Sequence, residues 1–339
     1  MSKVVLRAAV IGCGAIAKTH SRALADADYA EIVSFTDIIP ERAEALKTAF
    51  APGAAVYTDW RRMLDEVAPD VVHVCTPHDL HKEMACECLG RGINVYLEKP
   101  ATITEDELSE LLAAEKASKA KITVSFQNRR IIPTRLFYSL IEENGGAKAA
   151  RGMVTWNRGR EYYTADEWHG TLEHEGGGAM INQAIHTLDM LVNAFPAPAV
   201  AVQGQVANWE NREFSEVEDN AGFLVTFEDG GKLSFYATND YPVDAKNFYE
   251  VLTHNGTRIT CLEGNVYKNG VKIDIEEDTL PVVGKACWGR GHAVAIREFY
   301  EAIVTGGEVP ITLASAARTM QVLFALYRSN GTRIPLTQL

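Results

Sequence analysis

Residues 4–126 alternate short apolar segments with stretches of helical periodicity, and this alternation constrains the fold more than any other feature. Connections of this length build right-handed βαβ units and a parallel sheet with helices on both faces. The expected strands are Val4–Val10, Glu31–Thr36, Val71–Cys75, Asn94–Leu97 and Ile122–Phe126. The expected helices are Ala15–Ala27, Pro40–Phe50, Asp59–Val67, Leu80–Arg91 and Glu105–Ser118. The sequence therefore predicts a doubly wound α/β domain over residues 1–126.

Beyond residue 150 the pattern changes to longer, partly alternating segments joined by tight turns such as Asn255-Gly256 and Asn269-Gly270. Consecutive strands with such turns are typical of an antiparallel sheet. The expected strands are Arg151–Arg158, Val200–Trp209, Ala221–Phe227, Lys232–Thr238 and Phe248–Thr253, and the expected helices are about Gly178–Asn193, Gly291–Val304 and Leu313–Ser329. We expect residues 127–339 to form an α+β domain with a large open, mainly antiparallel sheet. The helices within about 291–329 are candidates to pack back on the first domain.

Composition narrows the class of partner and compartment. Asp and Glu number 45 against 33 Lys and Arg, a formal net charge of −12, which disfavours nucleic acid and anionic membrane as partners. Six cysteines in 339 residues are too few for a disulfide scaffold and indicate free thiols in a reducing compartment, so we expect a cytoplasmic protein. The cysteine and histidine spacings match no zinc set, and we predict no metal.

The most informative motif follows the first strand. Gly12-Cys13-Gly14-Ala15-Ile16-Ala17 reads G-x-G-x-x-A between a strand and a helix, the context of a dinucleotide-binding turn in a Rossmann domain. Gly12 permits the tight turn, and Gly14 lets the backbone approach a pyrophosphate at the helix N-terminus, beside Ala15 and Ile16. Asp37 ends the next strand, where a carboxylate accepts ribose hydroxyls and repels a 2′-phosphate. Because residue 38 is Ile and not Arg, the sequence favours NAD over NADP.

Further motifs stand after two later strands and in the second domain. They are Thr76-Pro77 with His81, the tripeptide Glu98-Lys99-Pro100, and the segment from Gly176-Gly177-Gly178 through Asn182 and His186 to Asp189. With the glycine turn running on to His20 and a late Gly291-His292, these motifs cover essentially the whole chain. In this order and spacing the chain resembles the Gfo/Idh/MocA family of NAD(P)-dependent sugar and cyclitol oxidoreductases.

The resemblance implies roles for individual residues. Lys99 would lie against the nicotinamide and hydrogen-bond the reacting oxygen, and His186 would move the hydroxyl proton, so these two are the predicted catalytic residues. The predicted cofactor contacts are Gly12, Gly14, Ala15, Ile16, Asp37, Thr76, Pro77, His81, Glu98 and Lys99. Many members carry Asp four residues before the histidine, whereas this chain has Asn182. An amide orients a substrate hydroxyl but relays no proton, so we assign Asn182 to substrate orientation.

An aromatic and basic segment at residues 156–169, before the glycine run of the second domain, is a candidate substrate wall. Aromatic rings beside cationic side chains suit stacking on a sugar ring. The predicted substrate-binding residues are Asn182, Trp168, His169, Arg158 and Tyr163, with Trp288–His292 as a further candidate. His81 suits a cap of its helix or packing under its loop as well as a cofactor or substrate contact, whereas we expect His20, in the first helix, to be structural.

These observations favour an NAD-dependent dehydrogenase that acts on a secondary hydroxyl of a neutral sugar, glycoside or cyclitol. Two alternatives stay open: a redox-neutral enzyme that retains NAD while it breaks a glycosidic bond, and a catalytically silent sugar or NAD sensor. The apolar alternation of Leu224–Phe227 and Leu233–Tyr236 also indicates an exposed sheet face. We expect that face to be buried in a homodimer or homotetramer.

Overall fold

The computed structural model describes residues 4–275 and 290–337, which divide into two compact units. The first unit holds residues 4–102, 106–130 and 290–313, and the second holds 103–105, 131–275 and 314–337. Among the C-terminal helices, α9 (Gly291–Thr305) belongs to the first unit, whereas α10 (Leu313–Ser329) belongs to the second from residue 314 onward. The sequence pattern places the change between the domains at residues 126 and 127.

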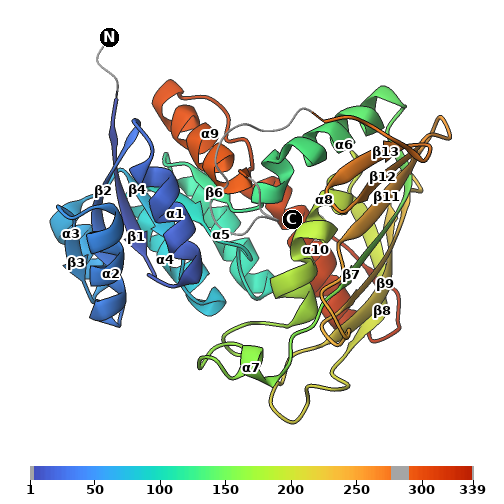
Figure 1. The fold of residues 1–339 in the computed structure, drawn as a ribbon, viewed down its shortest axis with the longest axis horizontal. Coiled ribbons are helices and arrows are strands. Elements are labelled where there is room, and N and C mark those ends of the chain that lie inside the picture. Colours follow the sequence, from blue (N-terminus) through green and yellow to red (C-terminus); the bar gives the residue numbers. More distant parts are fainter. Residues whose placement is uncertain (1–3, 276–289, 338–339) are drawn as a thin grey trace. The chain divides into compact units, whose positions relative to one another are not determined.

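The first unit is built on a six-stranded sheet in the order β3-β2-β1-β4-β5-β6, in which every neighbouring pair is parallel. Its strands are β1 (Leu6–Ile11), β2 (Ala30–Thr36), β3 (Ala55–Tyr57), β4 (Val71–Val74), β5 (Asn94–Leu97) and β6 (Ile122–Val124). The helices between them are α1 (Ala15–Ala25), α2 (Pro40–Phe50), α3 (Trp60–Val67), α4 (His81–Gly90) and α5 (Glu105–Ala117). Figure 1 shows these strands flanked by helices. The predicted doubly wound domain is confirmed.

Burial explains why this sheet reads as continuous apolar runs. Val10, Val72 and Val95 are each 0% exposed, as expected when helices cover both faces of a parallel sheet. One polar residue, His73, lies within the fully buried strand β4 and is also 0% exposed. The three-residue edge strand β3 escaped the sequence analysis because so short a segment carries no periodicity.

The second unit is built on a nine-stranded sheet in the order β14-β13-β12-β11-β7-β10-β9-β8-β15. All its pairs are antiparallel except β10 with β7, so the predicted open, mainly antiparallel sheet is confirmed. The strands are β7 (Ala147–Thr155), β8 (Ala199–Ala207), β9 (Asn220–Phe227), β10 (Lys232–Thr238), β11 (Phe248–Thr253), β12 (Arg258–Leu262), β13 (Asn265–Lys268), β14 (Val271–Lys272) and β15 (Ile334–Pro335). The sequence analysis missed β12 to β15 and began β7 four residues late, at Arg151, because the strand starts with alanines of low strand propensity.

Helices cover one face of this second sheet. The helix α8 (Ile185–Val192) packs on β7 so closely that a Cβ atom added at Gly152 would lie 2.5 Å from Leu191 Cδ1. Within the described residues, the unit also contains α6 (Ile132–Glu143), which was not predicted, the single turn α7 (Arg160–Tyr163), and α10 from residue 314 onward. Along β10 buried and exposed residues alternate, and Phe235 points to the covered face while Tyr236 is 39% exposed on the other.

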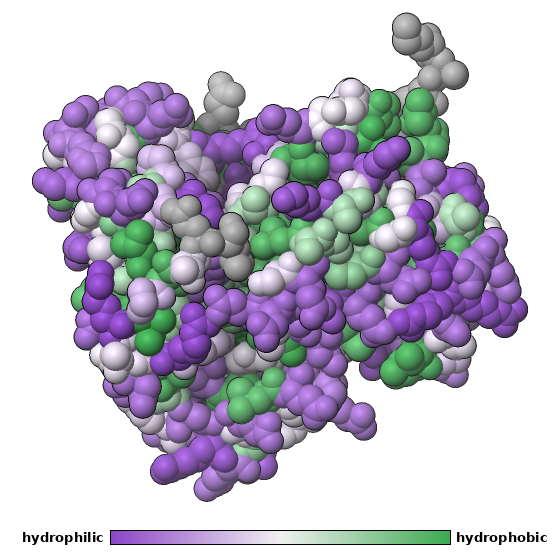
Figure 2. Space-filling view, turned by 180° about the vertical axis from the view of Figure 1, so that it is seen from behind, coloured by the Kyte–Doolittle hydropathy of each residue, from purple (hydrophilic) through white to green (hydrophobic). Residues whose placement is uncertain are grey.

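One face of the molecule is largely polar. Figure 2 shows one face of the molecule, on which hydrophilic residues predominate and hydrophobic residues form smaller groups. This agrees with the formal net charge of −12. Among the helices within residues 4–275 and 290–337, none has the length and apolar character that a membrane crossing requires.

Candidate active site

The glycine turn after β1 has the geometry of an anion cradle. Gly12 has φ +83°, and a Cβ atom there would lie 2.6 Å from the carbonyl carbon and oxygen of Cys75, so only glycine fits. At Gly14, which precedes α1, an added Cβ atom would meet nothing within 4 Å. Within the described residues, no side chain caps the N-terminus of α1. The open space and the uncapped N–H groups fit a dinucleotide pyrophosphate.

Asp37 lies beside this turn. Its Oδ2 accepts a hydrogen bond from the Cys13 amide at 2.7 Å, and its Oδ1 accepts one from the Ile39 amide at 2.9 Å. Each carboxylate oxygen has two lone pairs, so each can also accept a ribose hydroxyl, and the residue fits its predicted role. Burial and the nearby Asp37 carboxylate raise the pKa of the Cys13 thiol to about 12, which keeps that thiol protonated at neutral pH.

His81 connects the two loops that carry the other predicted cofactor contacts. Its Nδ1 lies 2.7 Å from the Pro100 carbonyl oxygen and its Nε2 lies 3.1 Å from that of Thr76. Burial lowers the pKa of His81, so the ring is neutral and its single N–H donates to one of these carbonyls. Both ring nitrogens therefore face protein atoms, and His81 holds the Thr76-Pro77 loop to the loop of Lys99.

Glu98 begins a buried polar network. Its Oε1 lies 2.8 Å from His20 Nε2, His20 Nδ1 lies 3.0 Å from His73 Nδ1, and His73 Nε2 lies 3.0 Å from the Tyr300 hydroxyl. Burial alone would raise the pKa of Glu98, but the hydrogen bond and charge of His20 outweigh it and hold that pKa below its usual range. The half-buried Lys99 is anchored here through its backbone N–H, which donates to Glu98 Oε2 at 3.3 Å.

The same network contains residue types that bind metals. The ligand atoms of His20, Glu98 and His292 lie within 4.8 Å of one another, and all three residues are buried. His20 Nε2 and Glu98 Oε1 are already at hydrogen-bonding distance, and burial lowers the pKa of His292 to about 3. We interpret the group as a hydrogen-bonded network that supports the Lys99 loop.

In the second unit, Asn182 and His186 lie on either side of a helical junction. A π-helical turn, Ala179–Ala184, leads into α8, and His186 is the half-buried second residue of α8. The Glu218 carboxylate accepts hydrogen bonds from the amides of Gly178 at 2.7 Å and Met180 at 2.9 Å. An added Cβ atom at Gly178 would lie 2.2 Å from the Glu218 carbonyl oxygen. This glycine run therefore permits close packing of the protein on itself.

Asn182 lies in a polar cluster that the sequence analysis did not anticipate. Its Nδ2 donates to the Tyr162 hydroxyl at 2.9 Å and to Glu175 Oε1 at 2.7 Å. The other oxygen of Glu175 accepts from the Gly170 amide at 2.6 Å, and Gln183 Nε2 donates to the Tyr162 hydroxyl at 2.7 Å. Glu175 was the residue missed. The available signal was an acidic residue directly before the glycine run.

The predicted substrate wall is partly assembled around Tyr162. The Arg158 guanidinium lies 5.6 Å from the centre of the Tyr162 ring, and the His169 ring lies 4.8 Å from it. Trp168 packs on His169 with ring centres 3.7 Å apart. Tyr163, in contrast, is only 3% exposed, and its hydroxyl accepts from Asn239 Nδ2 at 2.8 Å. Tyr163 thus supports the wall from inside the protein.

The candidate substrate segment Trp288–His292 is only partly described by the structure. Trp288 and Gly289 lie outside the described residues. Gly291 lies so close to Gln127 that an added Cβ atom would be 2.5 Å from its carbonyl oxygen, and His292 is 1% exposed within the Glu98 network. Gly291 and His292 therefore serve packing in the first unit.

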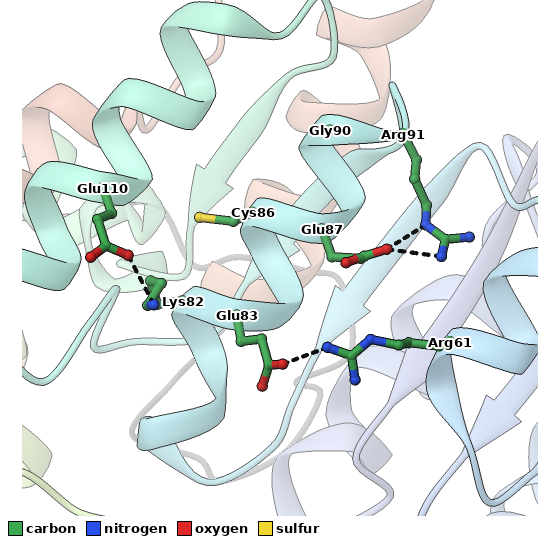
Figure 3. A pocket seen from close by; sticks show the side chains of 8 residues that line it. All are labelled: Arg61, Lys82, Glu83, Cys86, Glu87, Gly90, Arg91 and Glu110. Carbon is green, nitrogen blue, oxygen red and sulfur yellow. Dashed lines mark hydrogen bonds and ion pairs between the residues drawn. The ribbon is translucent and has the colours of Figure 1, made fainter.

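An open hollow elsewhere on the first unit is lined by charged side chains. It lies over α4, and Figure 3 shows Lys82 paired with Glu110 and Arg91 paired with Glu87. Glu83 also pairs with Arg61. Because opposite charges neutralise one another along this surface, we assign it no ligand.

Comparison with known proteins identifies relatives for both units. Residues 6–126 match the family model "Oxidoreductase family, NAD-binding Rossmann fold", and residues 142–259 match the "GFO/IDH/MocA C-terminal domain". The D-glucoside 3-dehydrogenase of Escherichia coli (strain K12) is 30% identical over 250 residues, 69% of this chain and 70% of that protein. An inositol 2-dehydrogenase of Burkholderia multivorans is 31% identical over 120 residues, 35% of this chain and 36% of that protein.

Solved structures extend the similarity over the whole chain. The WlbA dehydrogenase from Bordetella pertussis, in complex with NADH and UDP-GlcNAcA, has a TM-score of 0.84 at 27% identity. That match covers 98% of this chain and 99% of the neighbour. A levoglucosan dehydrogenase in complex with NADH has a TM-score of 0.86 at 22% identity, covering 98% and 100%, which shows a shared fold.

Proposed function

Because the chain belongs to the GFO/IDH/MocA family of NAD-binding oxidoreductases, we propose that it is an NAD-dependent dehydrogenase acting on a secondary hydroxyl of a sugar, glycoside or cyclitol. The observation that carries the proposal is the open, uncapped glycine turn beside Asp37, on a chain whose relatives are sugar and cyclitol dehydrogenases. NAD, when bound, supplies the hydride acceptor. Gly12, Gly14 and Asp37 would hold it, and the Asp37 carboxylate favours NAD over NADP.

Two residues are proposed to act on the reacting hydroxyl. The Lys99 ammonium would polarise the oxygen and stabilise the developing alkoxide. The imidazole of His186 would accept the hydroxyl proton, a role that suits a group whose ordinary pKa lies near neutrality. The buried network of Glu98 and His20, together with His81, holds the Lys99 loop in place.

The proposed substrate is a neutral ring. Trp168, His169 and Arg158, which gather around Tyr162, offer flat surfaces for stacking and polar edges for hydroxyl groups. The Arg158 guanidinium already pairs with Asp244 at 2.9 Å, so its charge is largely balanced. That balance favours an uncharged sugar over a sugar phosphate.

The test is the absorbance of reduced nicotinamide after the protein is mixed with NAD and one of several sugars. The panel contains methyl glucoside, levoglucosan, myo-inositol, glucose and a UDP-sugar acid, and the Lys99→Ala variant is the control. We expect NADH to form with one class of neutral ring and the variant to lose about 10³-fold in kcat, as for removal of one oxyanion-type donor. Bound NAD with no net NADH on any sugar would favour the redox-neutral alternative. If cells that carry Lys99→Ala also showed the same phenotype as wild-type cells, the sensor alternative would hold.

We further propose that the protein forms homodimers or homotetramers through the uncovered sheet face. Register aligns Leu262, Phe248, Met153 and Tyr236 in one row across β12, β11, β7 and β10. Met153 is 44% exposed and Leu262 is 39% exposed, and an apolar row of this kind favours association. Sedimentation of the wild type and of Met153→Glu tests this: a fall in mass is expected, and an unchanged mass contradicts it.

We also propose a cytoplasmic location. The five described cysteines, Cys13, Cys75, Cys86, Cys88 and Cys261, are all free thiols, which suits a reducing compartment. Fractionation of cells that express the full-length chain at native level tests this; recovery outside the cytoplasmic fraction would contradict it.

A further inference from the structure

Glu175 is a fully buried carboxylate to which the proposed reaction assigns no role. It is 0% exposed, and it lies directly before the glycine run of the second unit. One oxygen, Oε1, lies 2.7 Å from Asn182 Nδ2, and the other, Oε2, lies 2.6 Å from the Gly170 amide nitrogen. A buried charge is costly unless it is hydrogen-bonded, and both oxygens meet that requirement.

The contact fixes how the Asn182 amide is turned. A carboxylate can only accept, and Asn182 Nδ2 donates both to Glu175 and to the Tyr162 hydroxyl at 2.9 Å. The flipped amide would place two oxygens against each other beside Glu175. The carbonyl oxygen of Asn182 therefore points away from Glu175 and Tyr162, as a hydrogen-bond acceptor.

The cluster also contains one negative charge in an unusual place. Residue 182, four residues before His186, is an asparagine, so the helical segment itself carries no carboxylate at this position. Glu175 places a carboxylate at hydrogen-bonding distance from the same position. The pair Glu175 and Asn182 together holds one acid and one amide.

We propose that Glu175 is a positioning residue for the dehydrogenase reaction: its carboxylate supplies the negative charge of the residue-182 position and orients Asn182 so that its carbonyl oxygen receives a substrate hydroxyl. This inference rests on the proposed function. It identifies the acid–amide pair of Glu175 and Asn182, and not residue 182 alone, as the unit that receives the substrate hydroxyl.

Other titratable groups surround the pair, and the test must separate their effects. The Tyr162 pKa is raised by burial and by Glu175, and the pKa of Tyr327 is raised well above its usual range by burial first, with Glu218 and Glu175 contributing. Both phenols therefore stay protonated through neutral pH. Further described groups near the pair are Tyr163, which feels the charge of Glu175, Arg158 and His169 against the Tyr162 ring, and Asp166, which bonds His169 and raises the Tyr162 pKa.

A charge exchange between the two positions tests the proposal. The four chains are wild type, Glu175→Gln, Asn182→Asp and the double variant that carries both changes. Glu175→Gln places a donor against the Gly170 amide or against Asn182, and Asn182→Asp places two carboxylates at contact distance. The double variant again has one acid and one amide, because the glutamine introduced at position 175 can accept from Gly170 and donate to the aspartate introduced at position 182.

We expect each single variant to lose about 10- to 100-fold in kcat/KM, the usual range for a residue that orients a functional group, and the double variant to return to within about threefold of wild type. The ratio of kcat/KM in Asn182→Asp to that in wild type should rise as the pH is lowered from 8 to 6, because a shared proton relieves the paired carboxylates. Protonation of the proposed base His186 lowers the activity of both chains, so the ratio isolates the effect of the pair. Glu173→Gln, at an exposed acid two residues away, is the matched control and should leave the kinetics unchanged. All rates are measured at a temperature at which every variant is folded and binds NADH. A merely structural role would then appear as exchange rescue of the melting temperature alone, with kcat/KM equal in the four chains.

Two results would overturn the inference. One is a Glu175→Gln variant whose kcat/KM and pH profile equal those of wild type. The other is a double variant no more active than the weaker single variant while it binds NADH normally, which shows that it is folded. If Glu175→Gln itself fails to fold, the comparison of Asn182→Asp with the double variant still decides.

A failure of the proposed function gives a different result. A wild-type chain that forms no NADH with any sugar contradicts the proposed function. The pairing of Glu175 with Asn182 is then tested by melting temperatures, whose measurement needs no substrate. The melting deficit of Asn182→Asp should grow by several degrees from pH 5 to pH 8 and disappear in the double variant. A deficit that stays constant with pH, or persists in the double variant, overturns the pairing as well.

Discussion

Two glycine-rich segments, Gly12–Gly14 and Gly176–Gly178, precede helical structure in the two units, but they serve opposite purposes. An added Cβ atom at Gly14 would meet nothing within 4 Å, and no side chain caps α1 in the described residues. At Gly178 the same atom would lie 2.2 Å from the Glu218 carbonyl oxygen, and the Glu218 carboxylate already binds the Gly178 amide. The first segment is open to a ligand at Gly14, although Gly12 packs on the Cys75 backbone, and the second is filled by the protein. Glycine alone does not distinguish these uses.

The largest effect is expected at the filled segment. In Gly178→Ala the new methyl group meets backbone, which cannot rotate away, so we expect about 3 kcal/mol of destabilisation. At roughly 2–4 °C per kcal/mol this lowers Tm by about 6–12 °C. Differential scanning calorimetry measures it. An unchanged Tm would show that the second segment is as open as the first.

The open segment should respond in the reverse way. Gly14→Val has room for its side chain and φ −75°, which any residue adopts, so stability should change by less than about 0.5 kcal/mol. Because the side chain occupies the space proposed for the pyrophosphate, the Kd for NADH should rise about 100-fold, or about 2.7 kcal/mol. Calorimetric titration of NADH measures this. Unimpaired binding would mean that the cofactor lies elsewhere.

Acid should destabilise the first unit more than the second. In the first, burial lowers the pKa of His73, His81 and His292, the last to about 3. Below pH 6.5 these histidines bind protons in the unfolded chain but not in the folded unit. His292 alone then lowers the free energy of unfolding by about 1.4 kcal/mol for each pH unit. In the second, burial raises the pKa of Glu218, so its contribution to stability is lost as pH rises and regained on acidification. Hydrogen exchange between pH 6.5 and 5 should show the first unit opening first; the reverse order would contradict the assignment of neutral histidines.

The smallest effect concerns cofactor selection. Asp37→Ala removes the acceptor proposed for the ribose and weakens NAD binding about tenfold, the value of one hydrogen bond to a charged group. NADP binding should change less, because repulsion of the 2′-phosphate is removed at the same time. The ratio of the two Kd values is the measurement, and Ile38→Ala, at a neighbouring exposed residue, is the control. An unchanged ratio would remove Asp37 from the cofactor site.

The fold could be predicted further than the site, for a physical reason. Alternating strands and helices of the first unit are local patterns, and a buried strand such as Val71–Val74 shows its state in its own composition. The contacts of Asn182 with Glu175 and with Tyr162 join residues from separate segments of the chain. Nothing in the sequence between them fixes that geometry.

Histidines gave the least reliable sequence signal. His81 suited a cofactor contact or a buried residue equally well until both its ring nitrogens were found against carbonyl oxygens. His20 and His292 lie in one buried network although they are far apart in sequence, because α1 and α9 both reach Glu98. Tertiary packing decided their surroundings, and periodicity could not reveal it.

The most direct test of the proposed activity follows the hydride itself. A sugar from the panel, deuterated at the carbinol carbon that reacts, is incubated with the protein and NAD, and the cofactor is analysed by mass spectrometry. We expect deuterium to appear in released NADH and Lys99→Ala to slow the transfer about 10³-fold. Deuterium that remains in the sugar product, with no labelled NADH released, would contradict the proposed activity.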